Sequence, residues 1–103
     1  MQFRAKAMHS GKKAILMLPD RKKTPGIPLG ETPVMVNGRE LIARFAKIAV
    51  NVLLDEGANV LTPTLQGMFG PDAGMPGTRY FVEFLEIDGR LHMRPYVPES
   101  DAS

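Results

Sequence analysis

The chain has 103 residues, of which 44% are hydrophobic and 23% are charged, a composition typical of one globular domain with a modest core. It has no cysteine, which excludes disulfide frameworks and thiolate metal sites and fits a reducing compartment. No segment is apolar over the length of a membrane span, and residues 1–13 lack the apolar stretch of a secretory signal, so we expect a cytoplasmic protein with no membrane partner.

The net charge of +2 conceals an uneven distribution along the chain. Residues 1–50 hold ten Lys/Arg and three Asp/Glu, whereas residues 51–103 hold three Lys/Arg and eight Asp/Glu. Such asymmetry is typical either of a nucleic-acid surface or of electrostatic self-association. It has no such meaning if the two halves interleave in the fold.

The N-terminal segment predicts a β-hairpin. In residues 2–8 the apolar side chains of Phe3, Ala5 and Ala7 alternate with Arg4 and Lys6, as in a half-buried strand. Residues 14–18 form a short continuous apolar run, typical of a more buried strand, and residues 9–12 connect the two.

Residues 20–33 form an irregular stretch punctuated by Pro25, Pro28 and Pro33. A connection this long without regular structure is often functional or mobile. Residues 34–36 predict a short strand, followed by Asn37-Gly38.

The segment at residues 39–56 contains neither glycine nor proline, and its pattern predicts a long amphipathic helix. One helical face carries the apolar residues Leu41, Ile42, Phe45, Ile48, Ala49, Val52 and Leu53. Asn37 stands where an N-cap belongs, and Gly57 stands where a left-handed residue ends a helix. We expect Phe45, at the centre of this face, to be buried against the sheet.

The second half predicts one short helix and a second hairpin. Thr62-Pro63 is typical of a helix start, and Gly70 of its end. Residues 71–78 form a loop rich in glycine and proline, and residues 79–87 alternate as a strand. Asp88-Gly89 predicts a tight turn into a partner strand at 90–97, and residues 98–103 are expected to form a flexible tail.

This order of elements predicts a single α+β domain at residues 1–97, in which an antiparallel sheet of about four to five strands packs on one long amphipathic helix. The alternative is a small β-barrel with one helix, in which residues 41–54 are partly extended.

The sequence predicts no catalytic residue, no metal site and no cofactor. His9 and His92 are far apart and lie in no metal-binding spacing, and no GxSxG nucleophile motif is present. This pattern favours a protein that is not an enzyme.

The first functional hypothesis is therefore a small non-catalytic binding or assembly module that acts as a homodimer or binds another protein. Its expected contact surface is Met68, Phe69 and Met75, because flexible methionine and aromatic side chains suit an adaptable interface.

Two alternatives remain open. Nucleic acid would be bound by the basic residues of the N-terminal hairpin and the loop after it, namely Lys12, Lys13, Arg21, Lys22 and Lys23. A small-molecule binder or enzyme would need a pocket between helix and sheet, for which the polar candidates are His92, Tyr80, Arg79 and Asp72.

Overall fold

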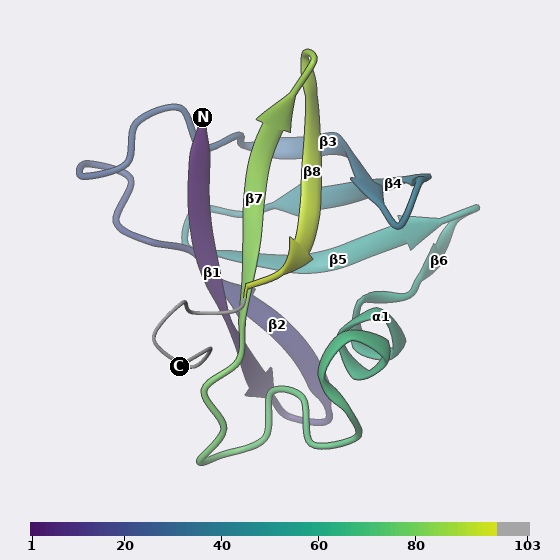
Figure 1. Ribbon diagram of the computed structural model, residues 1–103. Coiled ribbons are helices and arrows are strands. Elements are labelled where there is room, and N and C mark those ends of the chain that lie inside the picture. The colour runs from purple at the N-terminus through teal and green to yellow at the C-terminus, as the bar shows by residue number, and fades with distance from the viewer. Residues whose placement is uncertain (97–103) are drawn as a thin grey trace, which may run out of the picture.

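The computed structural model describes residues 1–96 (Figure 1), so the predicted tail at 98–103 lies outside the described residues. The elements in chain order are β1 (Gln2–Ser10), β2 (Lys13–Met17), β3 (Gly30–Val36), β4 (Arg39–Phe45), β5 (Ala49–Asp55), β6 (Ala58–Asn59), α1 (Leu61–Phe69), β7 (Phe81–Ile87) and β8 (Arg90–Pro95).

Seven of the described strands close into a β-barrel with one short helix at its end (Figure 1). The strand order is β2-β1-β7-β8-β3-β4-β5, and pairing of β2 with β5 closes the ring. The described pairings are antiparallel except the one between β3 and β8, which is parallel. Closure leaves short edges at β6, a two-residue strand on the rim of β5, and at the N-terminal half of β3.

The barrel interior is filled by side chains that alternate along each strand. Phe3, Ala5 and Ala7 of β1 point inward, as their spacing predicted. A cluster of aromatic rings lies at the centre: Phe3 stacks on Phe84 with centroids 5.0 Å apart, and Phe45 lies 5.4 Å from Phe84. The barrel is therefore a packed core and not a channel.

Each end of the barrel is covered by a different segment. Leu61 and Leu65 of α1 are buried where β2 begins and β5 ends, and the Thr62 hydroxyl accepts a hydrogen bond from the Ala14 N–H at 3.1 Å. At the opposite end, where β4 ends and β5 begins, the loop after β2 buries Ile27 in the same core.

The predicted long helix at residues 39–56 is wrong. This stretch forms the antiparallel strands β4 and β5, joined by a turn at residues 46–48. Phe45 is buried, as expected, and contacts Phe84 of the strand predicted at residues 79–87. However, Phe45 itself lies in strand β4 and not in a helix. Ile48, expected on the buried face, lies in the turn and is 63% exposed.

The register of β4 and β5 explains why the apolar pattern of residues 39–56 was interpreted as a helix. The pairing slips between Arg44 and Phe45, because Arg44 pairs with Val52 whereas Phe45 pairs with Val50, so the buried residues Val50 and Leu53 are three positions apart instead of two. A β-bulge of this kind interrupts the alternation that identifies a strand. The remaining spacing of apolar residues in this segment resembled the roughly 3.6-residue period of a helix.

The two residues expected to bound the helix belong to hairpin turns. Asn37 and Gly38 have φ angles of 52° and 78°, as a type I′ turn requires at both central positions, and they connect β3 to β4. Gly57, with φ of 87°, turns β5 into β6.

Three other predicted elements are confirmed, whereas the irregular stretch predicted at residues 20–33 already forms strand β3 from Gly30 onward. The N-terminal hairpin, the short helix and the β7–β8 hairpin all form, and the barrel alternative describes the fold. One detail differs: the helix starts after Val60, and Thr62 lies within it.

Candidate functional site

The seam between β3 and β8 has fewer residues in register than any other described pairing in the barrel wall. These strands are paired in register only at Met35 and His92, whereas β3 pairs with β4 over its whole length from Gly30 to Val36. Within residues 1–96, no strand is in register with β3 on its other side between Gly30 and Val34. Pro33 lies in this part of β3, and proline is tolerated in a strand where its nitrogen faces no ladder.

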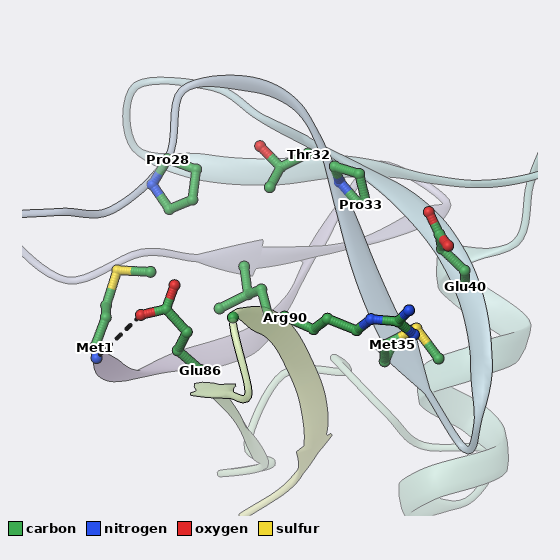
Figure 2. A pocket seen from close by; sticks show the side chains of 10 residues that line it. Met1, Pro28, Thr32, Pro33, Met35, Glu40, Glu86 and Arg90 are labelled. Atoms are coloured by element: carbon green, nitrogen blue, oxygen red, sulfur yellow. Dashed lines mark ion pairs between the residues drawn. The ribbon is translucent and has the colours of Figure 1, made fainter.

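A groove of about 470 Å³ lies along this seam (Figure 2). Its walls come from β3, the β7–β8 turn, the start of β4, the N-terminal residue and the loop before β3. The lining residues are Met1, Pro28, Thr32, Pro33, Met35, Glu40, Glu86, Gly89, Arg90 and Leu91. This volume is in the range of ligand sites in proteins, and the lining is mainly apolar with a few charged groups.

The charged groups of the groove are balanced in sign. The Met1 ammonium lies 3.8 Å from the Glu86 carboxylate at one end. Figure 2 shows Arg90 extending from the β8 side toward Met35, below Glu40. Two carboxylates thus face one guanidinium and one ammonium, so the groove suits a segment without strong net charge.

Arg21, one of the residues predicted to bind nucleic acid, is engaged in structural hydrogen bonds. Its guanidinium donates to the carbonyl oxygens of Lys47, Ile27, Pro28 and Ala46 at 2.7 to 2.9 Å. These bonds fasten the loop after β2 to the β4–β5 turn. Pro28 lines the groove, so Arg21 also positions one groove wall.

The four predicted lysines are not brought together. Lys12 and Lys13 lie at the β1–β2 turn, beside α1, whereas Lys22 and Lys23 lie in the loop at the opposite end of the barrel. They are exposed, and their role in binding stays a prediction.

The predicted contact residues Met68, Phe69 and Met75 are partly used by the fold. Met68 and Phe69 pack against the core, and Phe69 stacks on Tyr80 with centroids 4.8 Å apart. Met75 is 46% exposed. Their role as a partner surface is also still a prediction.

The four polar candidates for a pocket between helix and sheet do not converge on one. Tyr80 donates to Asp72 at 3.1 Å, and this bond, with burial and the Asp72 charge, raises the pKa of Tyr80. His92 lies instead on β8 beside Met35. A shallow depression of about 650 Å³ does lie between α1 and the β3–β4 turn, but none of the four lines it.

A second surface was missed by sequence reasoning: the outer face of β1, β7 and β8. Glu83 of β7 is almost fully buried there. It accepts hydrogen bonds from Gln2 at 2.8 Å and from the Arg94 Nε and Nη2 at 3.1 and 2.8 Å. The Gln2 bond is the main cause that lowers the pKa of Glu83; Arg94 and the Arg4 charge add to it, and burial opposes them. The Arg4 guanidinium lies 4.2 Å from the centroid of the Tyr96 ring.

No protein-family model, curated protein or solved structure matches the chain. Among residues 1–96, no group of three or more His, Asp or Glu side chains is placed to hold a metal ion. None of the described helices has the length and apolar character needed to cross a membrane.

Proposed function

We propose that this protein is a non-catalytic binding module that holds an extended segment of a partner polypeptide in the groove beside β3. The observation that carries the proposal is the single-bridge pairing of β3 with β8. It leaves one side of the N-terminal half of β3 without a strand in register, and extended peptides bind by adding to such edges.

The lining of the groove supports a peptide over a charged ligand. Pro28, Pro33, Met35 and Leu91 offer apolar contacts for alternate side chains of an extended segment. The balanced charges at its two ends disfavour a partner of high net charge. Flexible Met1 and Met35 side chains would adapt to segments of different shape.

The test is selection of random peptides of about seven residues, a length that spans one strand, against the full chain. Binding is then measured by titration calorimetry on the wild type and on Met35→Glu, which places a charge in the groove. We expect Met35→Glu to weaken binding by about tenfold or more, as loss of a central contact does.

Val52→Glu is the matched control. Val52 is likewise half-buried and lies outside the groove on β5, so this variant should bind within about threefold of the wild type. Methylation of alternate peptide nitrogens should abolish binding if the main chain pairs with β3. Selected peptides that bind Met35→Glu as well as the wild type would contradict the proposal.

A second copy of the chain is one source of the extended segment, so the homodimer remains part of this proposal. Size-exclusion chromatography with light scattering decides it. A strict monomer at high protein concentration removes the homodimer and leaves the peptide site to the titration.

A further inference from the structure

The charged residues of the barrel strands are divided between its two sides. The side made of β1, β2, β7 and β8 carries two carboxylates, Glu83 and Glu86, and five cations, namely Arg4, Lys6, Lys13, Arg90 and Arg94. The side made of β3, β4 and β5 carries three carboxylates and two cations, and both of those cations, Arg39 and Arg44, are in ion pairs. The excess positive charge is therefore on one side.

The basic side also presents aromatic rings beside its cations. Lys6 lies directly opposite Phe81 on one neighbouring strand and Met17 on the other. The Arg4 guanidinium covers the ring of Tyr96, and the Tyr96 N–H donates to the Phe81 carbonyl at 2.8 Å, which places Tyr96 beside Phe81, directly after the end of β8. Phe81 and Tyr96 are both partly exposed.

The carboxylate at the centre of this face, Glu83, forms an ion pair with one of the cations, Arg94. Glu83 is almost fully buried and is bonded by Gln2 and Arg94, so the Arg94 guanidinium is fixed on the outer face. Arg4 and Lys6 have no ion-pair partner among the described residues.

From this arrangement we infer that the outer face of β1, β7 and β8 binds single-stranded nucleic acid, with Arg4 and Lys6 on phosphates and Phe81 and Tyr96 as stacking surfaces for bases. Cations that track a backbone next to rings that stack on any base are the features of sequence-tolerant single-strand binding. The bases of a duplex are already paired and stacked on one another, so they could not stack on these rings. The inference is independent of the peptide groove, because none of these four residues lines it.

The experiment is fluorescence anisotropy of labelled oligo(dT) and oligo(U) of about 12 nucleotides, longer than the shortest single-strand sites. The full chain is titrated from about 20 to 200 mM salt, because phosphate contacts make affinity fall with salt. We expect binding of both oligonucleotides at low salt. Arg4→Ala/Lys6→Ala should raise Kd by about tenfold or more and flatten the log–log salt slope by about 1.4, since each single-strand phosphate contact contributes about 0.7.

Tyr96→Leu tests stacking without a change of charge. It should weaken binding several-fold while the salt slope stays unchanged, because base stacking does not release counterions. Thermal melts of each variant establish that the barrel is folded.

Two double variants serve as matched controls. Arg39→Ala/Arg44→Ala removes the same charge from the opposite side of the barrel, and Lys22→Ala/Lys23→Ala removes it from the loop. Each should change Kd by less than about threefold, as expected for charges outside the contact. A loss of affinity in either control as large as that of Arg4→Ala/Lys6→Ala would overturn the inference. Binding of anionic vesicles or phosphopeptides by a protein that binds neither oligonucleotide would also overturn it.

Discussion

The two ends of the barrel are closed by different chemistry. At one end α1 closes the barrel mainly with the buried apolar side chains of Leu61 and Leu65, and one hydrogen bond, from the Ala14 N–H to the Thr62 hydroxyl, joins it to β2. At the other end Ile27 is buried under a loop, and Arg21 donates hydrogen bonds to four carbonyl oxygens of that loop and of the β4–β5 turn.

The difference follows from the local sequence. In a helix the interior backbone groups bond to one another, so α1 covers the core mainly through its apolar face. The loop before β3 contains Pro25 and Pro28, which donate no backbone hydrogen bond, and its carbonyls need donors from elsewhere. Arginine suits this task because its planar guanidinium carries five N–H donors.

The largest expected effect comes from Phe45, which lies next to the Arg21-bound turn and belongs to the aromatic cluster. Phe45→Ala should lower the free energy of unfolding by about 3–5 kcal/mol, through lost burial and the cavity left between Phe3 and Phe84. Urea unfolding with matched m-values measures it. Lys47→Ala, in the adjacent turn, should change stability by less than about 0.5 kcal/mol, and equal midpoints for the two variants would contradict the packing described.

At the helix end, Leu65→Ala should lower the free energy of unfolding by about 2–5 kcal/mol, because Leu65 is fully buried where α1 covers the core. Gln66→Ala, on the exposed side of the same helix, is the control and should change stability by less than about 0.5 kcal/mol. A loss for Leu65→Ala no larger than that of the control would mean that α1 is not part of the closure.

The comparison of the two ends also shows which features sequence reasoning reached. The short helix was predicted, although not its place at an end of a barrel, because Thr62-Pro63, Leu65 and Gly70 are local signals within ten residues of one another. The hairpins β1–β2 and β7–β8 were predicted for the same reason. Asp88-Gly89 forms the expected turn, with φ angles of 51° and 78°.

The loop end and the β4–β5 hairpin were not predicted, because their signals are weak or nonlocal. The turn at residues 46–48 contains none of the usual turn residues, and the bulge hides the alternation of the second strand. Asn37 was interpreted as an N-cap, although Asn-Gly is also a strong signal for a type I′ hairpin turn.

The candidate sites depend on contacts between distant parts of the chain. The groove exists because β3 and β8 meet at Met35 and His92, residues far apart in sequence. Gln2 reaches Glu83 across a separation of 81 residues. Neither pairing can be detected in local sequence patterns, so sequence reasoning found neither the groove nor the outer face on which Arg4, Lys6 and Arg94 lie.

A smaller effect is expected from the hydrogen bonds at the loop end. Arg21→Lys keeps the charge but replaces a fork of donors by one ammonium, which cannot reach four carbonyl oxygens at once. We expect a loss of about 1.5–3 kcal/mol in urea unfolding, the range for hydrogen bonds that involve a charged group. Amide exchange at residues 46–48 should also become faster.

The neighbouring Lys22→Ala is the control for Arg21, because its exposed side chain makes none of these bonds. It should leave both the midpoint and the exchange rates unchanged. If Arg21→Lys behaves like Lys22→Ala, the loop end is held by Ile27 alone, and the two ends are closed by the same apolar means.

The smallest change in the free energy of unfolding is expected for Glu83, in the barrel wall between the two ends, and it should depend on pH. The hydrogen bond from Gln2 and the bonds from Arg94 keep the pKa of Glu83 below its ordinary value of 4.5, against the opposing effect of burial. A lowered folded-state pKa means that ionised Glu83 contributes stability above the unfolded-state pKa, and that this contribution is lost as pH falls through the folded-state pKa.

Glu83→Gln should therefore be less stable than the wild type at pH 7, and the difference should shrink as pH falls below about 4.5. Urea midpoints from pH 7 to pH 3 measure it, with Leu65→Ala as a reference whose difference from the wild type should stay constant. A Glu83→Gln difference that is equally constant would show that packing of this side chain, and not its charge, holds Gln2 and Arg94 on the outer face.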